Sequence, residues 1–89
     1  MPANYELAQN FPNPFNLTTV IRYGVPQDGP VSLDVFDVTG QKILTLVNEQ
    51  QARGFYEVHF YTGDLPSGIY LYRLVSGKFI LMKKMILTK

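Results

Sequence analysis

The side chains best suited to nucleophilic or acid–base chemistry are few and scattered along this 89-residue sequence. Ser32, Asp34 and His59 supply the three residue types of a hydrolytic triad, in which an imidazole activates a hydroxyl. No G-x-S-x-G turn presents a serine as a nucleophile, however. His59 alternates with Glu57 and Tyr61, away from the apolar positions, so we expect it at the surface. The sequence therefore predicts no catalytic residue and no enzyme.

Metal chemistry is also poorly supported by the side chains. Asp34 and Asp37 lie in one short segment, but hard cations such as calcium take six to eight oxygen ligands. Asp37 is better explained as the cap of a tight turn that ends at Gly40, since aspartate bonds its own backbone and glycine adopts positive φ. The sequence has no cysteine, which excludes disulfides and thiolate metal sites. We expect no metal and no cofactor.

Charge is distributed unevenly along the chain. The first 64 residues carry three basic and seven acidic side chains, whereas the remainder carries five basic side chains and no acidic one. Such asymmetry suggests a polar interaction surface in the last third. The overall charge of +1 and the lack of a known module pattern argue against nucleic-acid binding. The sequence shows no signal peptide at its start and no apolar run long enough for an integral membrane segment.

Period-2 alternation of apolar residues dominates the chain and predicts strands with half-buried faces. The expected strands are residues 18–25, 31–35, 42–47, 55–61, 69–75 and 79–87, with a possible seventh near 5–7. Residues 48–54 are expected to form a longer polar loop, and Ser76-Gly77 a short hairpin. Strands at this spacing, punctuated by glycine and proline, predict an all-β fold, an immunoglobulin-like antiparallel β-sandwich of six to seven strands.

Two loop motifs are expected to serve the fold. Leu65-Pro66-Ser67-Gly68-Ile69-Tyr70 is similar to a tyrosine corner, in which the tyrosine hydroxyl bonds the backbone upstream. Asn10-Phe11-Pro12-Asn13-Pro14-Phe15-Asn16 contains two prolines that fix φ and favour extended neighbours. We expect Phe11 and Phe15 to insert into one end of the sandwich. A structural clamp is favoured over a binding loop.

The final segment, residues 78–89, is the strongest candidate for a functional surface. Phe79, Leu81, Met85 and Leu87 are expected to face the core, while Lys83 breaks the alternation and Lys84 points outward. Lysines on an edge strand prevent unwanted sheet-to-sheet pairing, which is one explanation. The other explanation is that a partner docks on this strand by strand addition and also recognises its positive charge. The residues alone leave both explanations open.

Four motifs together resemble the C-terminal sorting domain (type A) of the bacterial type IX secretion system. They are the 10–16 segment, the V-x-D-x-x-G pattern formed by Val35, Asp37 and Gly40, the 65–70 segment, and the closing Lys83-Lys84-Met85-Ile86-Leu87. The resemblance covers residues 5–89, nearly the whole chain, and Thr39 stands where leucine is common. The sequence is also similar to the immunoglobulin-like domain of flagellar hook-capping proteins.

The resemblance implies a non-catalytic signal that directs a parent protein across the outer membrane, through the periplasm, to the cell surface or the medium. The implied partners are the outer-membrane secretion machinery, the parent secreted protein and a sortase-like protease that cuts before Tyr5. Residues 1–4 would then be a linker remnant or an added start. The signal is expected from about Gly68 onward. The expected recognition residues are Gly68, Tyr70, Lys78, Lys83, Lys84, Met85 and Lys89, and the expected structural residues are Phe11, Pro12, Asn13, Pro14, Phe15, Asp37, Gly40, Leu65, Gly68 and Tyr70.

Two alternatives belong to other functional classes. A small β-sandwich appended to a secreted enzyme can bind a glycan or the parent's catalytic domain. Tyr23, Tyr56, Tyr61 and Tyr72 would stack on sugars if they were exposed together, although the absence of tryptophan weakens this hypothesis. A structural spacer, as in the hook-capping proteins, would need neither exposed tyrosines nor an accessible last strand.

Overall fold

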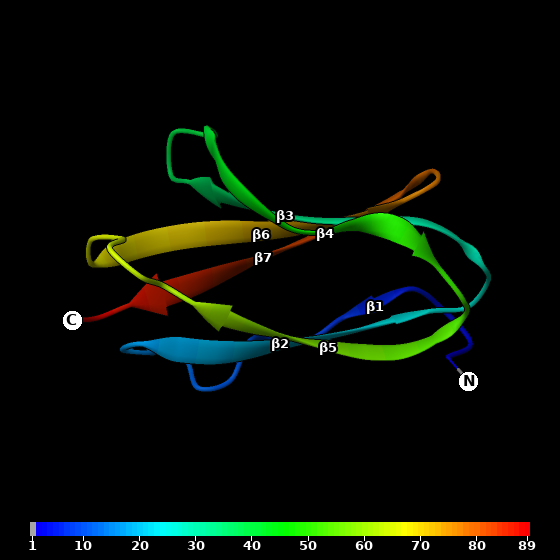
Figure 1. Cartoon of the computed structure of the whole chain (residues 1–89), viewed down its shortest axis with the longest axis horizontal. Helices are drawn as coiled ribbons and strands as arrows, with labels where there is room; N and C mark the ends of the chain where they lie inside the picture. Colours follow the sequence, from blue (N-terminus) through cyan, green and yellow to red (C-terminus); the bar gives the residue numbers. More distant parts are fainter. Residues whose placement is uncertain (1) are drawn as a thin grey trace.

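The computed structural model describes residues 2–89, which form seven strands and no helix. The strands are β1 (Glu6–Leu7), β2 (Thr18–Val25), β3 (Gly29–Asp37), β4 (Lys42–Gln51), β5 (Gly54–Tyr61), β6 (Gly68–Ser76) and β7 (Phe79–Leu87). They build two sheets, with strand orders β1-β2-β5 and β4-β3-β6-β7, that face one another (Figure 1). All strand pairs are antiparallel. The predicted immunoglobulin-like sandwich is confirmed.

Alternating apolar residues on each strand form the core between the sheets. On β2, Thr19, Ile21, Tyr23 and Val25 are buried. The buried core residues come from every strand except β4 and include Phe15 from the segment before β2; they are Leu7, Phe15, Ile21, Tyr23, Val25, Val31, Leu33, Val35, Phe60, Tyr70, Tyr72, Leu74, Met85 and Leu87. Removing this apolar surface from water is the main stabilising contribution to the fold.

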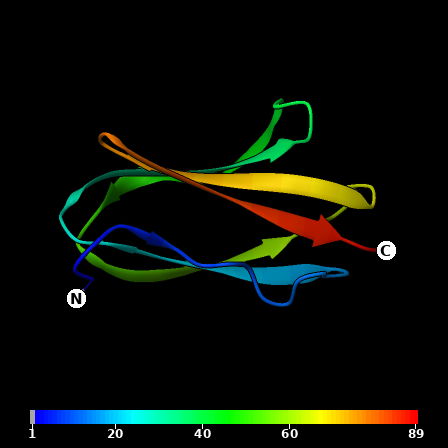
Figure 2. The same cartoon turned by 180° about the vertical axis from the view of Figure 1, so that it is seen from behind.

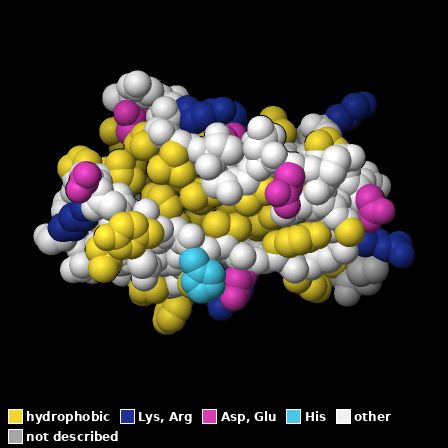
Figure 3. Space-filling view, viewed as in Figure 1, with side chains coloured by type: hydrophobic (Ala, Val, Ile, Leu, Met, Phe, Trp, Pro, Cys, Tyr) yellow, Lys and Arg dark blue, Asp and Glu magenta, His cyan; other side chains and the backbone are white. Residues whose placement is uncertain are grey.

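The sandwich has two long sides with different strands. On one side the edge strands are β4 and β5; on the other they are β1 and β7, which lie in front in the reverse view (Figure 2). Figure 3 shows apolar side chains gathered between the sheets on the β4 and β5 side. The half-buried apolar residues of these two strands are Ile43, Leu44, Leu46, Val47, Tyr56 and Val58.

The predicted polar loop at residues 48–54 is wrong, because β4 continues to Gln51. Its polar end pairs with the start of β3, with Glu49 opposite Val31 and Gln51 opposite Gly29. An edge strand exposed to solvent needs no continuous apolar face, so backbone pairing extends the strand where the side-chain pattern stops. The last hairpin is also displaced by one residue: Ser76 pairs with Phe79, and the connecting residues are Gly77 and Lys78.

The turn after β3 is capped by Asp37. Its Oδ1 accepts hydrogen bonds from the backbone N–H groups of Thr39 (2.9 Å) and Gln41 (3.0 Å). Hydrogen bonds from Thr39 and from the Gln41 backbone hold the pKa of Asp37 below its ordinary value. Gly40 has φ of 89°, a conformation that favours glycine. The turn therefore has the chemistry that the sequence predicts for these residues.

The start of β6 has the hydrogen bond of a tyrosine corner. The hydroxyl of Tyr70, which is buried, donates to the carbonyl of Pro66 at 2.6 Å. Leu65 packs against the core next to this bond, and Gly68 begins the strand. The corner fixes the path of the chain as it enters the central strands of its sheet.

Within residues 2–89 no helix is long and apolar enough to cross a membrane.

Candidate protein-docking strand

The C-terminal strand β7 is an edge strand that carries both inward and outward apolar residues. Met85 and Leu87 are fully buried on the inner side, whereas Ile80 and Met82 on the outer side are 62% and 50% exposed. Lys83 and Lys84 are exposed at the middle of the strand. A strand covered on both faces would bury all of these apolar groups, so β7 leaves one face and part of its edge accessible.

Phe79 is on the inner side of β7 but is not buried in the core as the sequence predicts. It is 54% exposed, and its ring stacks on Tyr5 with 4.2 Å between ring centroids. Phe79 closes the hairpin opposite Ser76, at the end of the sheet, where the opposing sheet offers only the chain leading into β1. Alternation along the strand does not reveal where the facing sheet ends.

The 10–15 segment pairs with the C-terminal half of β7. Phe15 donates its backbone N–H to the carbonyl of Ile86 (2.9 Å) and accepts from the N–H of Thr88 (2.8 Å). Asn13 Oδ1 accepts from the N–H of Ile86 (2.9 Å). Gln9 Nε2 donates to the carbonyl of Lys84 (2.6 Å). The outward backbone groups of β7 are therefore satisfied from the carbonyl of Lys84 to the end of the strand.

This segment changes sheets between its two phenylalanines. Phe11 exchanges two backbone hydrogen bonds with Val20 in the sheet of β2, and Phe15 forms a parallel bridge with Leu87 in the other sheet. The peptide bonds before Pro12 and Pro14, which lie in the crossing, are cis. Prolines suit this crossing because they donate no backbone hydrogen bond to either sheet.

Only one of the two phenylalanines inserts into the sandwich. Phe15 is 2% exposed and lies 6.2 Å from the ring of Phe60, whereas Phe11 is 73% exposed. The prediction for Phe11 is therefore wrong. The backbone of Phe11 is still paired with Val20 in the sheet of β2, and its side chain is left facing solvent. Phe15 enters the core after the crossing.

A buried polar network ties the 10–15 segment to β6. The hydroxyl of Tyr72 donates to the carbonyl of Ala8 (2.6 Å) and accepts from the N–H of Asn10 (2.8 Å). Asn10 Nδ2 donates in turn to Thr19 Oγ1 (3.0 Å) and to the carbonyl of Pro12 (3.1 Å). Asn10 lies immediately before the proline-rich run, where backbone groups need side-chain partners, and it satisfies the carbonyl of Pro12. Its link to Tyr72, 62 positions away, could not be predicted from the sequence.

Burial of Tyr72 makes the fold sensitive to alkaline pH. Desolvation raises the pKa of Tyr72 to about 12, against a backbone hydrogen bond that lowers it. The raised pKa means that the stabilisation is complete below pH 10 and is lost as the pH rises toward 12. We expect the native chain to lose about 2–3 kcal/mol of unfolding free energy over this range through Tyr72. Denaturant unfolding of the native chain and of Tyr72→Phe at each pH isolates this contribution; parallel losses in both would contradict it.

The expected recognition residues divide into two groups. Gly68, Lys78, Lys83, Lys84 and Lys89 are exposed, whereas Tyr70 and Met85 are buried. Lys89 is held at the end of the chain, where its Nζ donates to the carbonyl of Gly63 at 2.8 Å. In the folded domain the exposed lysines are therefore accessible to a partner, whereas the side chains of Tyr70 and Met85 are not.

The outer face of the larger sheet contains a buried carboxylate. Asp34 is 2% exposed and accepts hydrogen bonds from Thr45 Oγ1 (2.6 Å) and Ser32 Oγ (2.9 Å), with Lys42 Nζ at 3.7 Å. Desolvation raises the pKa of Asp34, but these two hydroxyls, Lys42 and Arg73 outweigh it and hold that pKa below its ordinary value. The carboxylate is fully engaged by its neighbours.

The triad considered from the sequence is not assembled. Ser32 and Asp34 lie on β3, whereas His59 lies on β5 of the other sheet, 3.6 Å from Glu57. Among residues 2–89, no group of three or more His, Cys, Asp or Glu side chains is placed to hold a metal ion. The hydroxyl of Ser32 is occupied by Asp34 and has no imidazole beside it.

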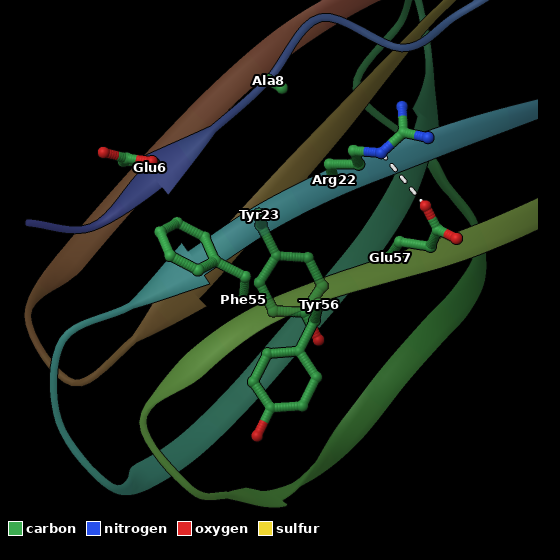
Figure 4. A pocket seen from close by; sticks show the side chains of 7 residues that line it. All are labelled: Glu6, Ala8, Arg22, Tyr23, Phe55, Tyr56 and Glu57. Carbon is green, nitrogen blue, oxygen red and sulfur yellow. Dashed lines mark ion pairs between the residues drawn. The ribbon is translucent and has the colours of Figure 1, made fainter. Parts of the chain in front are cut away.

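A shallow hollow of about 530 Å³ lies over β1, β2 and β5 (Figure 4). Its lining residues are Glu6, Ala8, Arg22, Tyr23, Phe55, Tyr56 and Glu57. Arg22 and Glu57 pair with each other at 3.0 Å. The rings of Tyr23 and Tyr56 stack on one another, 5.4 Å apart.

The tyrosines do not form the exposed row that glycan stacking would need. Tyr23 and Tyr72 are 3% and 0% exposed, Tyr56 is half-buried, and only Tyr61 among the four is exposed, at 64%. Alternation placed Tyr23 and Tyr72 on the apolar faces of their strands, and in each case the opposing sheet covers that face. This removes the observation on which the glycan hypothesis depended.

Comparison with known protein families matches residues 9–88 to the secretion system C-terminal sorting domain. The chain belongs to this family. It is a C-terminal sorting signal of the type IX secretion system, and the protein that carries it is a bacterial protein destined for secretion or the cell surface. The match begins at Gln9 and so includes the segment that crosses between the sheets, together with β7.

Among solved structures, the sorting domain is similar to a part of dimeric latent PorU from Porphyromonas gingivalis. The TM-score is 0.70 at 23% sequence identity, over 91% of this chain and 9% of that chain. At this identity the likeness shows the fold. This sorting domain therefore spans about a tenth of the length of the protein it matches. A comparison with curated proteins finds no significant match.

Proposed function

We propose that the sorting domain acts as a passive, non-catalytic ligand, and that the secretion machinery recognises its last two strands, residues 68–89. The observation that carries this proposal is the exposure of β7 at the edge of its sheet, with Lys83 and Lys84 in the middle of the strand. No acidic residue lies in β6 or β7. This part of the surface thus combines accessible backbone, apolar side chains and uncompensated positive charge.

The contacts of the side chains that could take part in catalysis support a non-catalytic role. Asp34 is bound by two hydroxyls and His59 sits on an exposed surface beside Glu57. A general base or nucleophile must lie within hydrogen-bond reach of its partner group. The side chains that could serve are distributed over two sheets, so the domain is the object of recognition and the chemistry belongs to its partners.

We propose residues 5–89 as the functional domain, with a sortase-like protease cutting before Tyr5. Tyr5 packs on Phe79 and precedes β1, so removal of the residues before it would leave all strands intact. Ala3 and Asn4 are exposed and lie outside the strands, where a protease can reach the backbone. The parent protein would precede this point.

An export assay tests recognition by the lysines. A periplasm-directed fluorescent reporter would be fused to residues 5–89 in a type IX-competent bacterium, beside a reporter without the domain. In one variant Lys78, Lys83 and Lys84 are replaced by glutamine. In the matched control Arg22, Lys42 and Arg53 are replaced, which removes the same charge elsewhere.

We expect the fused domain alone to carry the reporter to the surface or medium. Exposed charges contribute a few tenths to about 1 kcal/mol each, so the three-lysine variant should export about tenfold less. The control variant should export normally. Native export by a folded three-lysine variant would contradict the proposed recognition surface, and retention of the intact fusion in the periplasm would contradict sorting by this domain.

A further inference from the structure

The N-terminal half of β7 has outward backbone groups that no described residue satisfies. In an antiparallel pair, every second residue directs its N–H and C=O away from its partner strand. Ile86 directs both groups to the 10–15 segment, so Lys84, Met82 and Ile80 direct theirs to the same outer edge. Among residues 2–89, only the carbonyl of Lys84 is bonded there, by Gln9. We call the remaining groups of residues 80–84 the open edge.

The 10–15 segment shows what this edge accepts. It binds β7 through a single bridge at Phe15, with backbone hydrogen bonds to Ile86 and Thr88, and through a side-chain bond from Asn13. It also marks where the open edge stops, because the groups beyond Lys84 are already taken. An incoming strand would therefore occupy the part of β7 between the last hairpin and Lys84, next to the internal segment that continues the pairing.

Apolar side chains accompany the open edge on the outer face of the sheet. Ile80 and Met82 are 62% and 50% exposed on this face. A strand added at this edge would place alternate side chains over Ile80 and Met82. Their burial would favour a partner whose outward residues on that face are apolar.

Charge discriminates between the possible partners. A second copy of β7 paired at the same edge would add two lysines and no acidic residue to a strand that already carries Lys83 and Lys84, and repulsion between like charges disfavours such a pair. The two lysines lie on opposite faces of β7, and no acidic residue of β6 or β7 compensates them. The lysines thus oppose self-association and favour an acidic partner.

We propose that the open edge receives, by β-strand addition, one extended segment of a partner protein in which acidic residues alternate with apolar ones. The proposal rests on the proposed function and specifies the chemistry of the partner strand. Backbone hydrogen bonds to Ile80, Met82 and Lys84 supply the pairing. Lys83, on the inner side of β7, selects the acidic residues, and Ile80 and Met82, on the outer side, receive the apolar ones. Lys84, at the end of the open edge, adds positive charge that favours an acidic sequence over a basic one.

The first test uses the whole chain, labelled with nitrogen-15, and two synthetic peptides of about six residues, a typical strand length. Valine alternates with glutamate in one peptide and with lysine in the other. We expect the glutamate peptide to shift the amide resonances of Ile80, Met82 and Lys84, and to bind about tenfold more tightly than the lysine peptide. Lys83→Glu with Lys84→Glu should reverse the preference, and Arg53→Glu, a charge change on a distant loop, should not.

Met82→Pro tests the backbone contribution. Its N–H faces outward, so proline removes a docking donor while the hydrogen bonds between β6 and β7 remain. We expect this variant to keep its fold, seen in its amide spectrum, and to bind the glutamate peptide about tenfold more weakly. Equal binding by a folded Met82→Pro variant, equal affinity for both peptides, no resonance shifts, or dimerisation of the native chain through β7 would each overturn the proposal.

The same variant separates this inference from the sorting function. In the export assay, Met82→Pro retains Lys78, Lys83 and Lys84, and we expect export to fall about tenfold. Normal export by a folded Met82→Pro variant would leave the sorting function intact and refute strand addition at the open edge. Failure of the native fusion to export would count against the sorting function itself.

Discussion

Replacing Phe15 with alanine is expected to lower the free energy of unfolding by about 3–5 kcal/mol, the range for buried phenylalanines. Phe15 is 2% exposed and packs beside Phe60, and its backbone pairs with Ile86 and Thr88. Loss of the ring would leave a cavity where the 10–15 segment joins β7. A domain of this size is commonly stable by about 5–10 kcal/mol, so the variant should be close to unfolding at ambient temperature.

Phe11→Ala is the matched control, because the same change is made four positions away in the same motif. Phe11 is 73% exposed, and exposed substitutions change stability by about 0.5 kcal/mol or less. Urea denaturation of both variants, followed by far-ultraviolet circular dichroism, measures the difference. Similar losses at the two positions would show that Phe15 does not anchor the segment.

Met85→Ala is expected to cost about 2–5 kcal/mol, the range for buried methionine. Met85 lies in the terminal motif of the family, but its side chain is 0% exposed and belongs to the core. We therefore expect loss of export by this variant to follow loss of folding. Met82→Ala, at a 50% exposed position on the same strand, should leave the stability nearly unchanged.

The decisive measurement compares stability and export of Met85→Ala at two temperatures. If export returns at a low temperature at which the variant is folded, Met85 acts through the core. If the folded variant is still not exported, Met85 contributes to recognition directly, through a conformation of β7 in which its side chain is accessible.

Much of the candidate site could be predicted from the sequence, because charge and short motifs are local properties. The asymmetry of charge singled out the last third of the chain, and Lys83 and Lys84 are exposed as an interaction surface requires. The pairing of the 10–15 segment with the C-terminal half of β7 could not be predicted from the sequence. It depends on contacts between Asn13 or Phe15 and Ile86, which are 73 and 71 positions apart in the sequence, and no local pattern encodes such a pairing.

The sequence by itself determined the fold class, the faces of most strands, the capped turn at Asp37 and the tyrosine corner at Tyr70, because period-2 burial and turn chemistry depend on neighbouring residues. The tertiary structure decided which strands lie at the edges, that Phe11 and Phe79 are exposed, and that β4 continues to Gln51. The alternation of apolar and polar residues indicates which face of a strand is buried. Only the packing of two sheets fixes where each face ends and which backbone groups remain unpaired.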